Sequence, residues 1–235
     1  MKTVAIIPAR GGSKRIPRKN IKNFAGQPII KYSIDAALAS GCFDEVMVST
    51  DDPEIAELSR SFGAAVPFLR SKENSLDTAV TVPVLKEVIE EYKKRGQEFD
   101  YLCSIFATAP FLSPRILKTA KEMLIQNDAD AVWPILKFSY PIQRALRMKE
   151  NNLMMVWPEN INARSQELET TYHDAGQFHF FKTSSVLKAG VELLDKTLAI
   201  EVSAWEAQDI DNEEDWKLAE VKFKILRNSD LWSGS

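Results

Sequence analysis

The sequence predicts an α/β fold, a single Rossmann-like domain built on a mostly parallel sheet. Its 235 residues suit one domain of this class. Hydrophobic residues make up 45% of the chain, as in globular proteins. Short apolar runs also alternate with segments of helical period up to residue 135. This alternation is typical of parallel strands joined by crossover helices that cover both faces of the sheet.

The expected strands are apolar runs of four to six residues. They cover residues 4–7, 46–50, 65–69, 101–106 and 131–135. The expected helices show apolar residues three and four positions apart, begin at Pro or at a capping residue, and stop at Gly. They run from Pro28 to Gly41, from Asp52 to Gly63, from about Thr81 to Gly96, and onward from Pro114.

The pattern changes after residue 135. Residues 137–172 lack a helical period but are rich in apolar side chains, and Arg144 and Arg147 alternate with apolar positions as on a hairpin. We expect an inserted arm that packs against a second subunit and forms a symmetric homodimer. The alternative is an inserted hairpin that closes a core within its own chain. Later strands at 177–181 and 197–202, and a final helix, complete a single domain over residues 1–230.

The first strand runs into a loop in which three small residues lie among five cations. The small residues are Gly11, Gly12 and Ser13, and the cations are Arg10, Lys14, Arg15, Arg18 and Lys19. Glycine lets a backbone turn its N–H groups toward an anion, and Lys and Arg supply charge. A solvated basic turn is the alternative. Because so many cations repel one another unless an anion lies among them, we expect a polyphosphate here.

A pair of carboxylates lies near the C-terminus. Asp209 and Asp211 are two positions apart in an extended segment, so both side chains point the same way. Mg²⁺ takes one or two carboxylates and completes its shell with water and phosphate oxygens. The alternative is that Asp211 caps the helix that follows. Beside a polyphosphate loop, we expect Mg²⁺ binding.

Parallel sheets bind ligands beyond the C-terminal ends of their strands. This rule gathers four loops around one crevice, at residues 8–20, 51–52, 70–81 and 108–113. Arg70, Asp77 and Thr81 are candidates for a base pocket, although Asp77 is equally suited to cap the next helix. On the late strand, period two places Gln177 and His179 on one face, and His179 is explained as well by packing as by ligand contact.

Several classes of function are disfavoured. The net charge of −3 argues against nucleic acid as the main partner. No apolar segment approaches the length of a membrane span, and the N-terminal apolar run is too short for a signal peptide. Cys42 and Cys103 are too few for a disulfide framework, which favours the cytoplasm. Without a Ser-His-Asp arrangement, the remaining chemistry is phosphoryl or nucleotidyl transfer by positioning and charge stabilisation.

Three segments carry a family resemblance. They resemble the signature, the cytidine-binding segment and the Mg²⁺ motif of the cytidylyltransferases that activate nine-carbon and eight-carbon acidic sugars as CMP-sugars. The segments are Ile7-Pro8-Ala9-Arg10-Gly11-Gly12-Ser13-Lys14-Arg15-Ile16-Pro17-Arg18-Lys19-Asn20; Arg70 with Leu76-Asp77-Thr78-Ala79 and Thr81; and Asp209-Ile210-Asp211. The similarity covers nearly the whole chain and implies the nucleotide-diphospho-sugar transferase type of fold.

The sugar-facing segments differ from those of the sialic-acid members. Tyr172-His173-Asp174-Ala175-Gly176-Gln177-Phe178, with Tyr140-Pro141-Ile142-Gln143-Arg144, resembles the pseudaminic acid cytidylyltransferases of bacteria. The resemblance implies transfer of CMP from CTP to the anomeric hydroxyl of pseudaminic acid, with release of pyrophosphate. The same reaction on N-acetylneuraminic, legionaminic or Kdo-type acid is the alternative. A non-catalytic nucleotide-binding protein is a third interpretation.

The resemblance also implies roles for individual residues. The nucleotide would be held by Ala9, Arg10, Gly11, Gly12, Ser13, Lys14, Asn20, Arg70 and Thr81. Lys19, Arg10 and Asp211 would be catalytic, and Asp209 and Asp211 would hold Mg²⁺. Lys137 and Arg164 would meet the sugar carboxylate, while Gln177 and His179 would read the sugar's substituents.

Overall fold

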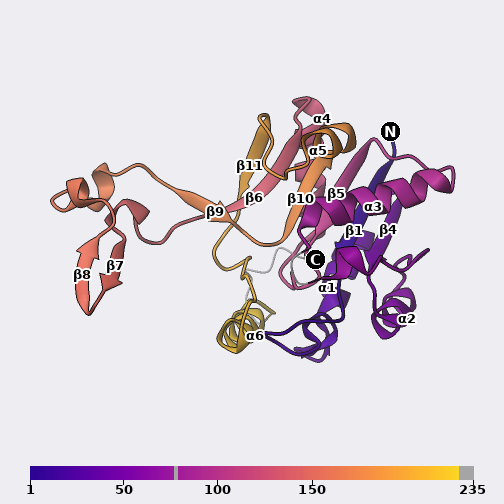
Figure 1. Cartoon of the computed structure of the whole chain (residues 1–235), viewed down its shortest axis with the longest axis horizontal. Coiled ribbons are helices and arrows are strands. Elements are labelled where there is room, and N and C mark those ends of the chain that lie inside the picture. The colour runs from indigo at the N-terminus through magenta and orange to yellow at the C-terminus, as the bar shows by residue number, and fades with distance from the viewer. Residues whose placement is uncertain (77–78, 228–235) are drawn as a thin grey trace.

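A seven-stranded sheet forms the centre of the computed structural model, which describes residues 1–76 and 79–227 (Figure 1). Across the sheet the strands follow the order β11 (Thr197–Glu201), β6 (Ala131–Lys137), β10 (Phe178–Lys182), β5 (Tyr101–Ile105), β1 (Thr3–Pro8) and β4 (Glu45–Ser49), and β9 (Tyr172–Asp174) pairs with the end of β6. Only β10 and β9 run antiparallel to their neighbours among these strands. The prediction of a mostly parallel sheet is confirmed.

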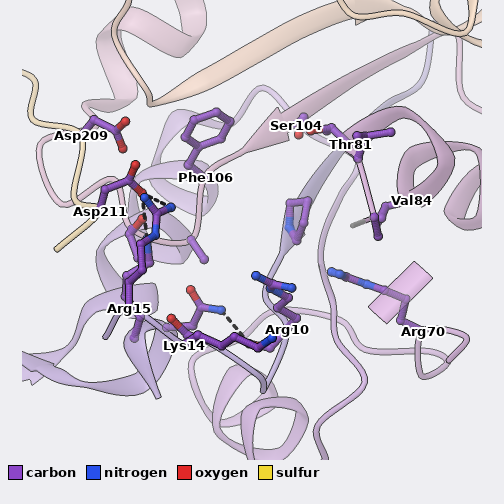
Figure 2. A pocket seen from close by; sticks show the side chains of 18 residues that line it. Arg10, Lys14, Arg15, Arg70, Thr81, Val84, Ser104, Phe106, Asp209 and Asp211 are labelled. Atoms are coloured by element: carbon purple, nitrogen blue, oxygen red, sulfur yellow. Dashed lines mark hydrogen bonds and ion pairs between the residues drawn. The ribbon is translucent and has the colours of Figure 1, made fainter. Parts of the chain in front are cut away.

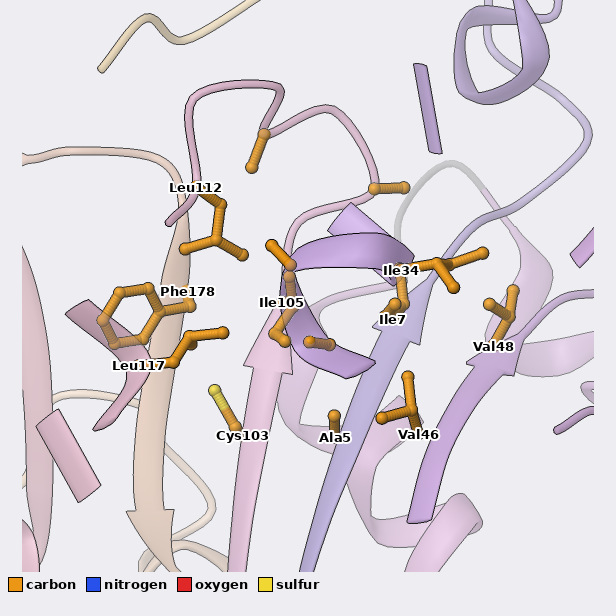
Figure 3. Packing of buried hydrophobic residues seen from close by; sticks show 14 of the residues in the cluster. Ala5, Ile7, Ile34, Val46, Val48, Cys103, Ile105, Leu112, Leu117 and Phe178 are labelled. Atoms are coloured by element: carbon orange, nitrogen blue, oxygen red, sulfur yellow. The ribbon is translucent and has the colours of Figure 1, made fainter. Parts of the chain in front are cut away.

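Helices cover both faces of this sheet. On one face lie α1 (Ile29–Ser40), α2 (Pro53–Ser61) and α4 (Pro114–Gln126), and on the other lie α3 (Thr81–Lys94) and α5 (Thr183–Ala189). Alternate residues of each strand face opposite sides of the sheet. Ala5 and Ile7 pack under α1 (Figure 3), whereas Val4 and Ile6 pack under α3. Fully burying a Val or Ile side chain contributes about 1.5–3 kcal/mol, so these two layers hold the sheet in place.

The helix ends follow from local chemistry. The Asp52 carboxylate accepts hydrogen bonds from the backbone N–H groups of Glu54 and Ile55 and so caps α2, as expected. Pro53 and Pro114 stand in the first turns of α2 and α4. Gly41 ends α1 with φ 62°, a left-handed conformation that glycine adopts without a steric cost.

The last helix lies at one end of the sheet. α6 (Glu213–Arg227) buries Trp216, Ala219, Phe223 and Leu226 along one side. They pack against Phe24, which belongs to the small hairpin of β2 (Asn23–Phe24) and β3 (Gln27–Pro28) that follows the basic loop. This apolar cluster therefore joins α6 to the hairpin that follows the basic loop. None of the helices in residues 1–76 and 79–227 combines the length and apolar character needed to cross a bilayer.

Two local predictions were wrong. Residues 65–69 do not form a strand; they make a single parallel bridge between Met47 and Ala65. Pro67 has no backbone N–H to donate, so the ladder along β4 is interrupted there. Conversely, the seven-residue helix α5 was not expected, because Thr183-Ser184-Ser185 is a weak helix former and the helix depends on packing of Val186 against the sheet.

Residues 137–172 leave the domain as a long arm (Figure 1). The arm carries the hairpin β7 (Leu146–Lys149) and β8 (Asn152–Met155) and three single 3₁₀ turns. Leu146, Met148 and Leu153 are more than half exposed. The alternative, a hairpin that closes a core within its own chain, is therefore wrong for the part of the arm that the structure describes. Dimerisation through the arm stays a prediction.

Candidate active site

A cavity of about 700 Å³ opens beyond the C-terminal ends of β1 and β5 (Figure 2). Three of the four predicted loops line it, together with the Asp–Ile–Asp segment. Of the predicted site residues, it is lined by Arg10, Ser13, Lys14, Lys19, Asn20, Arg70, Thr81, Asp209 and Asp211. Of the four loops expected at one crevice, those at residues 8–20, 70–81 and 108–113 line the cavity and the one at 51–52 does not.

The fourth loop, residues 51–52, does not line the cavity but contacts the backbone of the basic loop. The backbone N–H of Gly11 donates to Asp51 Oδ1 at 3.0 Å, and that of Ala9 donates to the Ser49 carbonyl at 2.9 Å. These two N–H groups hold the loop against β4. Ala9, Gly11 and Gly12, which were also expected to hold the nucleotide, do not line this cavity, and their contact with a ligand stays a prediction.

Gly11 has a different role, which is close packing. A Cβ at this position would lie 2.5 Å from Asp52 Oδ2, whereas one at Gly12 would meet nothing within 4 Å. Asp52 is held firmly there because it caps α2 and pairs with the Arg18 guanidinium. This pairing lowers the pKa of Asp52. Of the five cations, Arg18 therefore ties the loop to α2 and does not line the cavity.

Two of the remaining cations, Arg15 and Lys19, reach Asp211 at one end of the cavity. Arg15 Nη2 lies 2.7 Å from Asp211 Oδ1 (Figure 2), and Lys19 Nζ lies 3.8 Å from the same oxygen. Lys19 also donates to the Ile210 carbonyl at 2.6 Å. Burial lowers the pKa of Lys19, and the neighbouring carboxylates oppose that shift. Burial and the nearby Asp211 raise the pKa of Asp209.

The helix-capping alternative for Asp211 is wrong. The Asn212 side chain accepts the backbone N–H groups of Glu214 and Asp215 at 2.8 and 3.0 Å, so Asn212 caps α6. Asp215 in turn accepts the N–H groups of Asp211 and Asn212. The Asp211 carboxylate thus faces the cavity instead of the helix.

Two carboxylates facing one cavity fit a hard divalent cation. In the described ranges, no group of three His, Cys, Asp or Glu side chains is placed to hold a metal ion. Such a cation would therefore take its other ligands from water and from phosphate oxygens, which is how Mg²⁺ is commonly bound beside nucleotides. The carboxylate pair and the cationic loop are complementary parts of such a site.

The other end of the cavity is less charged. Arg70 is buried there, with Nε 3.0 Å from Ser49 Oγ and its Nη2 bonded to the Ser49 carbonyl. Burial lowers the pKa of Arg70 to about 10, so the guanidinium keeps its charge at neutral pH. Thr81, Val84 and Ser104 stand nearby (Figure 2). The third base-pocket candidate, Asp77, lies outside the described residues.

The four residues expected to contact the sugar do not line this cavity. Lys137 is exposed at the end of β6, and Arg164 lies on the arm with its Nε 4.0 Å from Glu167. Gln177 is buried and donates to the Glu206 carbonyl. Its side chain lines a separate cavity of about 130 Å³. Within one chain, these residues are not brought together.

His179 is a packed residue, as the alternative interpretation held. Its Nε2 lies 2.8 Å from Asp174 and its Nδ1 lies 2.9 Å from Glu192. The ring stacks on Trp133 with centroids 3.9 Å apart. Burial acts to lower the pKa of His179, but the hydrogen bonds to both carboxylates outweigh it and raise that pKa. Both ring nitrogens are engaged by these carboxylates, and a direct contact of His179 with the sugar stays a prediction.

Sequence reasoning missed Ser104 and Val84 as lining residues. Ser104 follows Leu102 and Cys103 in a strand that is otherwise apolar, and this single polar position was the available signal. Its importance emerges only in the fold, because β5 lies at the centre of the sheet and ends at the cavity.

Comparisons with known proteins agree with this geometry. A family model described as Cytidylyltransferase matches residues 4–230. Pseudaminic acid cytidylyltransferase from Campylobacter jejuni subsp. jejuni serotype O:2 is 42% identical over 230 residues, which cover 97% of this chain and 99% of that protein. CMP-N,N′-diacetyllegionaminic acid synthase from Legionella pneumophila is 38% identical over 123 residues, or 52% of this chain and 53% of that one.

A solved structure shares the fold. It is a CMP:2-keto-3-deoxy-manno-octonic acid synthetase complexed with CTP, with a TM-score of 0.70 and 18% sequence identity. The match covers 97% of this chain and 100% of that one. At this identity the likeness concerns the fold alone.

Proposed function

Because the chain belongs to the cytidylyltransferase family, we propose that it transfers CMP from CTP to the anomeric hydroxyl of pseudaminic acid and releases pyrophosphate. The observation that carries this proposal is the 42% identity to a pseudaminic acid cytidylyltransferase over 97% of the chain. The cavity supports it, since Arg15, Lys19 and two carboxylates gather at one end, and Thr81, Val84 and Ser104 stand with the buried Arg70 at the less charged end.

The proposed reaction is a direct displacement. The anomeric oxygen attacks the α-phosphorus of CTP, the bond from that phosphorus to the bridging oxygen breaks, and pyrophosphate leaves while the hydroxyl loses its proton. Arg10, Lys14 and Arg15 would bind the triphosphate and offset its charge. Lys19 would offset charge near the α-phosphate, where its buried ammonium is held by the Ile210 carbonyl. Preorganised cations of this kind stabilise charge that develops on phosphate oxygens.

Asp209 and Asp211 are the residues that would hold Mg²⁺. When bound, the cation would orient the phosphate oxygens and stabilise developing negative charge. Arg15 now donates to Asp211, and a bound triphosphate offers this guanidinium an alternative anion. The carboxylate would then be released toward the metal.

Pyrophosphate release is the experiment that tests this function. The full chain is incubated with CTP and Mg²⁺ and with pseudaminic, N-acetylneuraminic, legionaminic or Kdo acid in parallel. Turnover with pseudaminic acid, abolished when EDTA removes the Mg²⁺, is the expected result. Turnover with a different acid would leave CTP as the nucleotide substrate but overturn the assignment of the sugar. CTP binding without turnover on any acid would favour a non-catalytic nucleotide-binding protein.

Legionaminic acid is the second candidate sugar. The observation in its favour is the 38% identity to a CMP-N,N′-diacetyllegionaminic acid synthase, although that match covers only 52% of the chain. The pseudaminic relative matches the whole domain, including the segment 172–178 that we expect to lie near the sugar. The panel of four acids separates these two sugars directly.

We also propose that the protein works in the cytoplasm as a homodimer joined through residues 137–172. The exposed Leu146, Met148 and Leu153 of the hairpin support this, because a small domain rarely leaves such side chains in water without a partner. A symmetric contact would bring the arm of one subunit to its partner. Lys137 and Arg164 would then meet the sugar only if the partner's cavity lies within reach of the arm.

A further inference from the structure

Ser104 carries a buried hydroxyl that has no hydrogen-bond partner. Its side chain is fully buried on β5, between Cys103 and Ile105 of the sheet core. In the ranges that the structure describes, six buried side-chain polar atoms are without a partner, in Thr3, Ser104, Trp133, Gln143, Thr171 and Thr183. Of these six residues, Ser104 is the one that lines the large cavity.

A buried hydroxyl without a partner is energetically unfavourable, because it has lost its hydrogen bonds to water and gained none from the protein. Such groups are tolerated where they serve a ligand. An unpaired buried hydroxyl in the lining of a cavity therefore indicates a binding role. The position of Ser104 in the cavity then decides which part of a ligand it would meet.

The two ends of the cavity differ in charge. Asp209, Asp211 and Arg15 lie on one side (Figure 2). Ser104, Thr81 and Val84 lie together on the other side with Arg70, whose guanidinium is bonded to Ser49 (Figure 2). A triphosphate belongs with the cations and the metal carboxylates. The end at Ser104 therefore receives the part of the nucleotide farthest from the phosphates, which is the base.

The chemistry at that end matches a pyrimidine. Val84 offers an apolar surface to the face of a ring, and a serine hydroxyl both donates and accepts hydrogen bonds. The edge of cytosine presents a ring nitrogen acceptor beside an amine donor, and a hydroxyl can satisfy either. We propose that the Ser104 hydroxyl is a direct hydrogen-bond partner of the cytosine ring in bound CTP, an inference that rests on the proposed function.

This role makes stability and affinity respond in opposite ways. Ser104→Ala removes an unpaired polar group from the empty protein, so the melting temperature should stay unchanged or rise. The same change removes a ligand hydrogen bond, so CTP should bind about 5- to 20-fold more weakly. A purely structural serine would not combine these two results.

The experiment is calorimetric titration of the full chain with CTP and with ribose 5′-triphosphate, which lacks the base. Thr3→Val is the matched control, because it deletes another unpartnered buried hydroxyl at the start of β1, away from the cavity. Ser104→Cys keeps the size of the side chain but weakens the hydrogen bond, and it should give an intermediate loss of affinity. Ser104→Ala should weaken CTP alone, and Thr3→Val should weaken neither ligand.

Two results would overturn the inference. One is a Ser104→Ala protein that binds CTP within twofold of the wild type. The other is an equal loss of affinity for ribose 5′-triphosphate, which would mean that the substitution acts through the phosphate loop. A wild-type protein that prefers UTP or ATP to CTP, or that binds no nucleoside triphosphate, would instead overturn the proposed function and this inference with it.

Discussion

Arg15 Nη2 lies 2.7 Å from Asp211 Oδ1, although 196 positions separate the two residues in the chain. This contact joins the basic loop after β1 to the segment that precedes α6. The pair is partly exposed, with 67% of the Arg15 side chain and 41% of the Asp211 side chain open to solvent. Exposed ion pairs contribute little to stability, so this one can exchange partners when ligands arrive.

Asp211 can be tested without disturbing α6, since Asn212 is the residue that caps the helix. Asp211→Asn keeps the shape of the side chain and removes its charge, and we expect turnover to fall on the order of 100-fold with a weakened Mg²⁺ dependence. The melting temperature should stay close to that of the wild type. The measurement is the rate of pyrophosphate release as a function of Mg²⁺ concentration.

Asn212→Ala is the control for this prediction. Loss of the cap should lower the free energy of unfolding by about 1 kcal/mol and leave the Mg²⁺ titration unchanged. An Asp211→Asn enzyme that titrates with Mg²⁺ like the wild type would contradict the metal assignment.

Gly11 and Gly12 should respond differently to alanine. At Gly11 the new Cβ would meet Asp52 Oδ2 at 2.5 Å, so the loop must shift; overpacking of this kind costs about 1–3 kcal/mol. We expect Gly11→Ala to unfold at lower urea concentration and to bind CTP more weakly. Gly12→Ala has nothing within 4 Å of its Cβ and should resemble the wild type in both assays. Equal behaviour of the two variants would contradict the packing role of Gly11.

His179 is expected to stabilise the fold through Asp174 and Glu192. His179→Phe keeps an aromatic ring beside Trp133 but leaves two carboxylates without their shared donor. We expect a loss of about 2–3 kcal/mol, smaller than for a fully buried pair because 35% of the Asp174 side chain is exposed. Urea unfolding monitored by circular dichroism measures this loss in the free energy of unfolding. His173→Gln, which changes an exposed histidine, is the control.

The same pair should make stability depend on pH. Because the folded-state pKa of His179 is raised, its contribution is fully present below the unfolded value of about 6.5 and is lost as pH rises through the folded-state pKa. The free energy of unfolding of the wild type should therefore decline above about pH 6.5 relative to that of His179→Phe. A constant difference between the two proteins from pH 6 to pH 9 would argue that His179 is neutral in the fold.

The arm offers a test of the proposed homodimer. Leu153 is 67% exposed on β8, and Leu153→Arg would place a charge in the expected contact. We expect this variant to sediment as a monomer at concentrations where the wild type sediments as a dimer. Leu218→Arg changes a leucine that is 49% exposed on α6 and should leave the wild-type mass unaltered. A wild-type protein that sediments as a monomer would contradict the proposal that the arm forms a dimer.

Local signals in the sequence determined most of the secondary structure. The apolar runs of β1 and β5, the Asp52 cap and the Gly41 stop are each readable within a few residues, because strand and helix periods and end-capping are local effects. The two failures had different causes, a local one at Pro67 and a longer-range one at α5. Residues 65–69 lacked the donor needed for a ladder, and α5 depends on packing against β10.

The sequence by itself also determined the basic loop and the carboxylate pair, and it gathered the loops after the strands at one crevice, since parallel strands bring their C-terminal ends to one edge. Only the tertiary structure decided the roles within that set. It assigned Arg18 to Asp52 and Arg15 to Asp211, made Asn212 the cap, buried His179 between two carboxylates, and left Ser104 unpaired at the cavity. The physical reason is that hydrogen-bond partners are chosen by distance in space, and the crossovers of the sheet bring residues nearly 200 positions apart into contact.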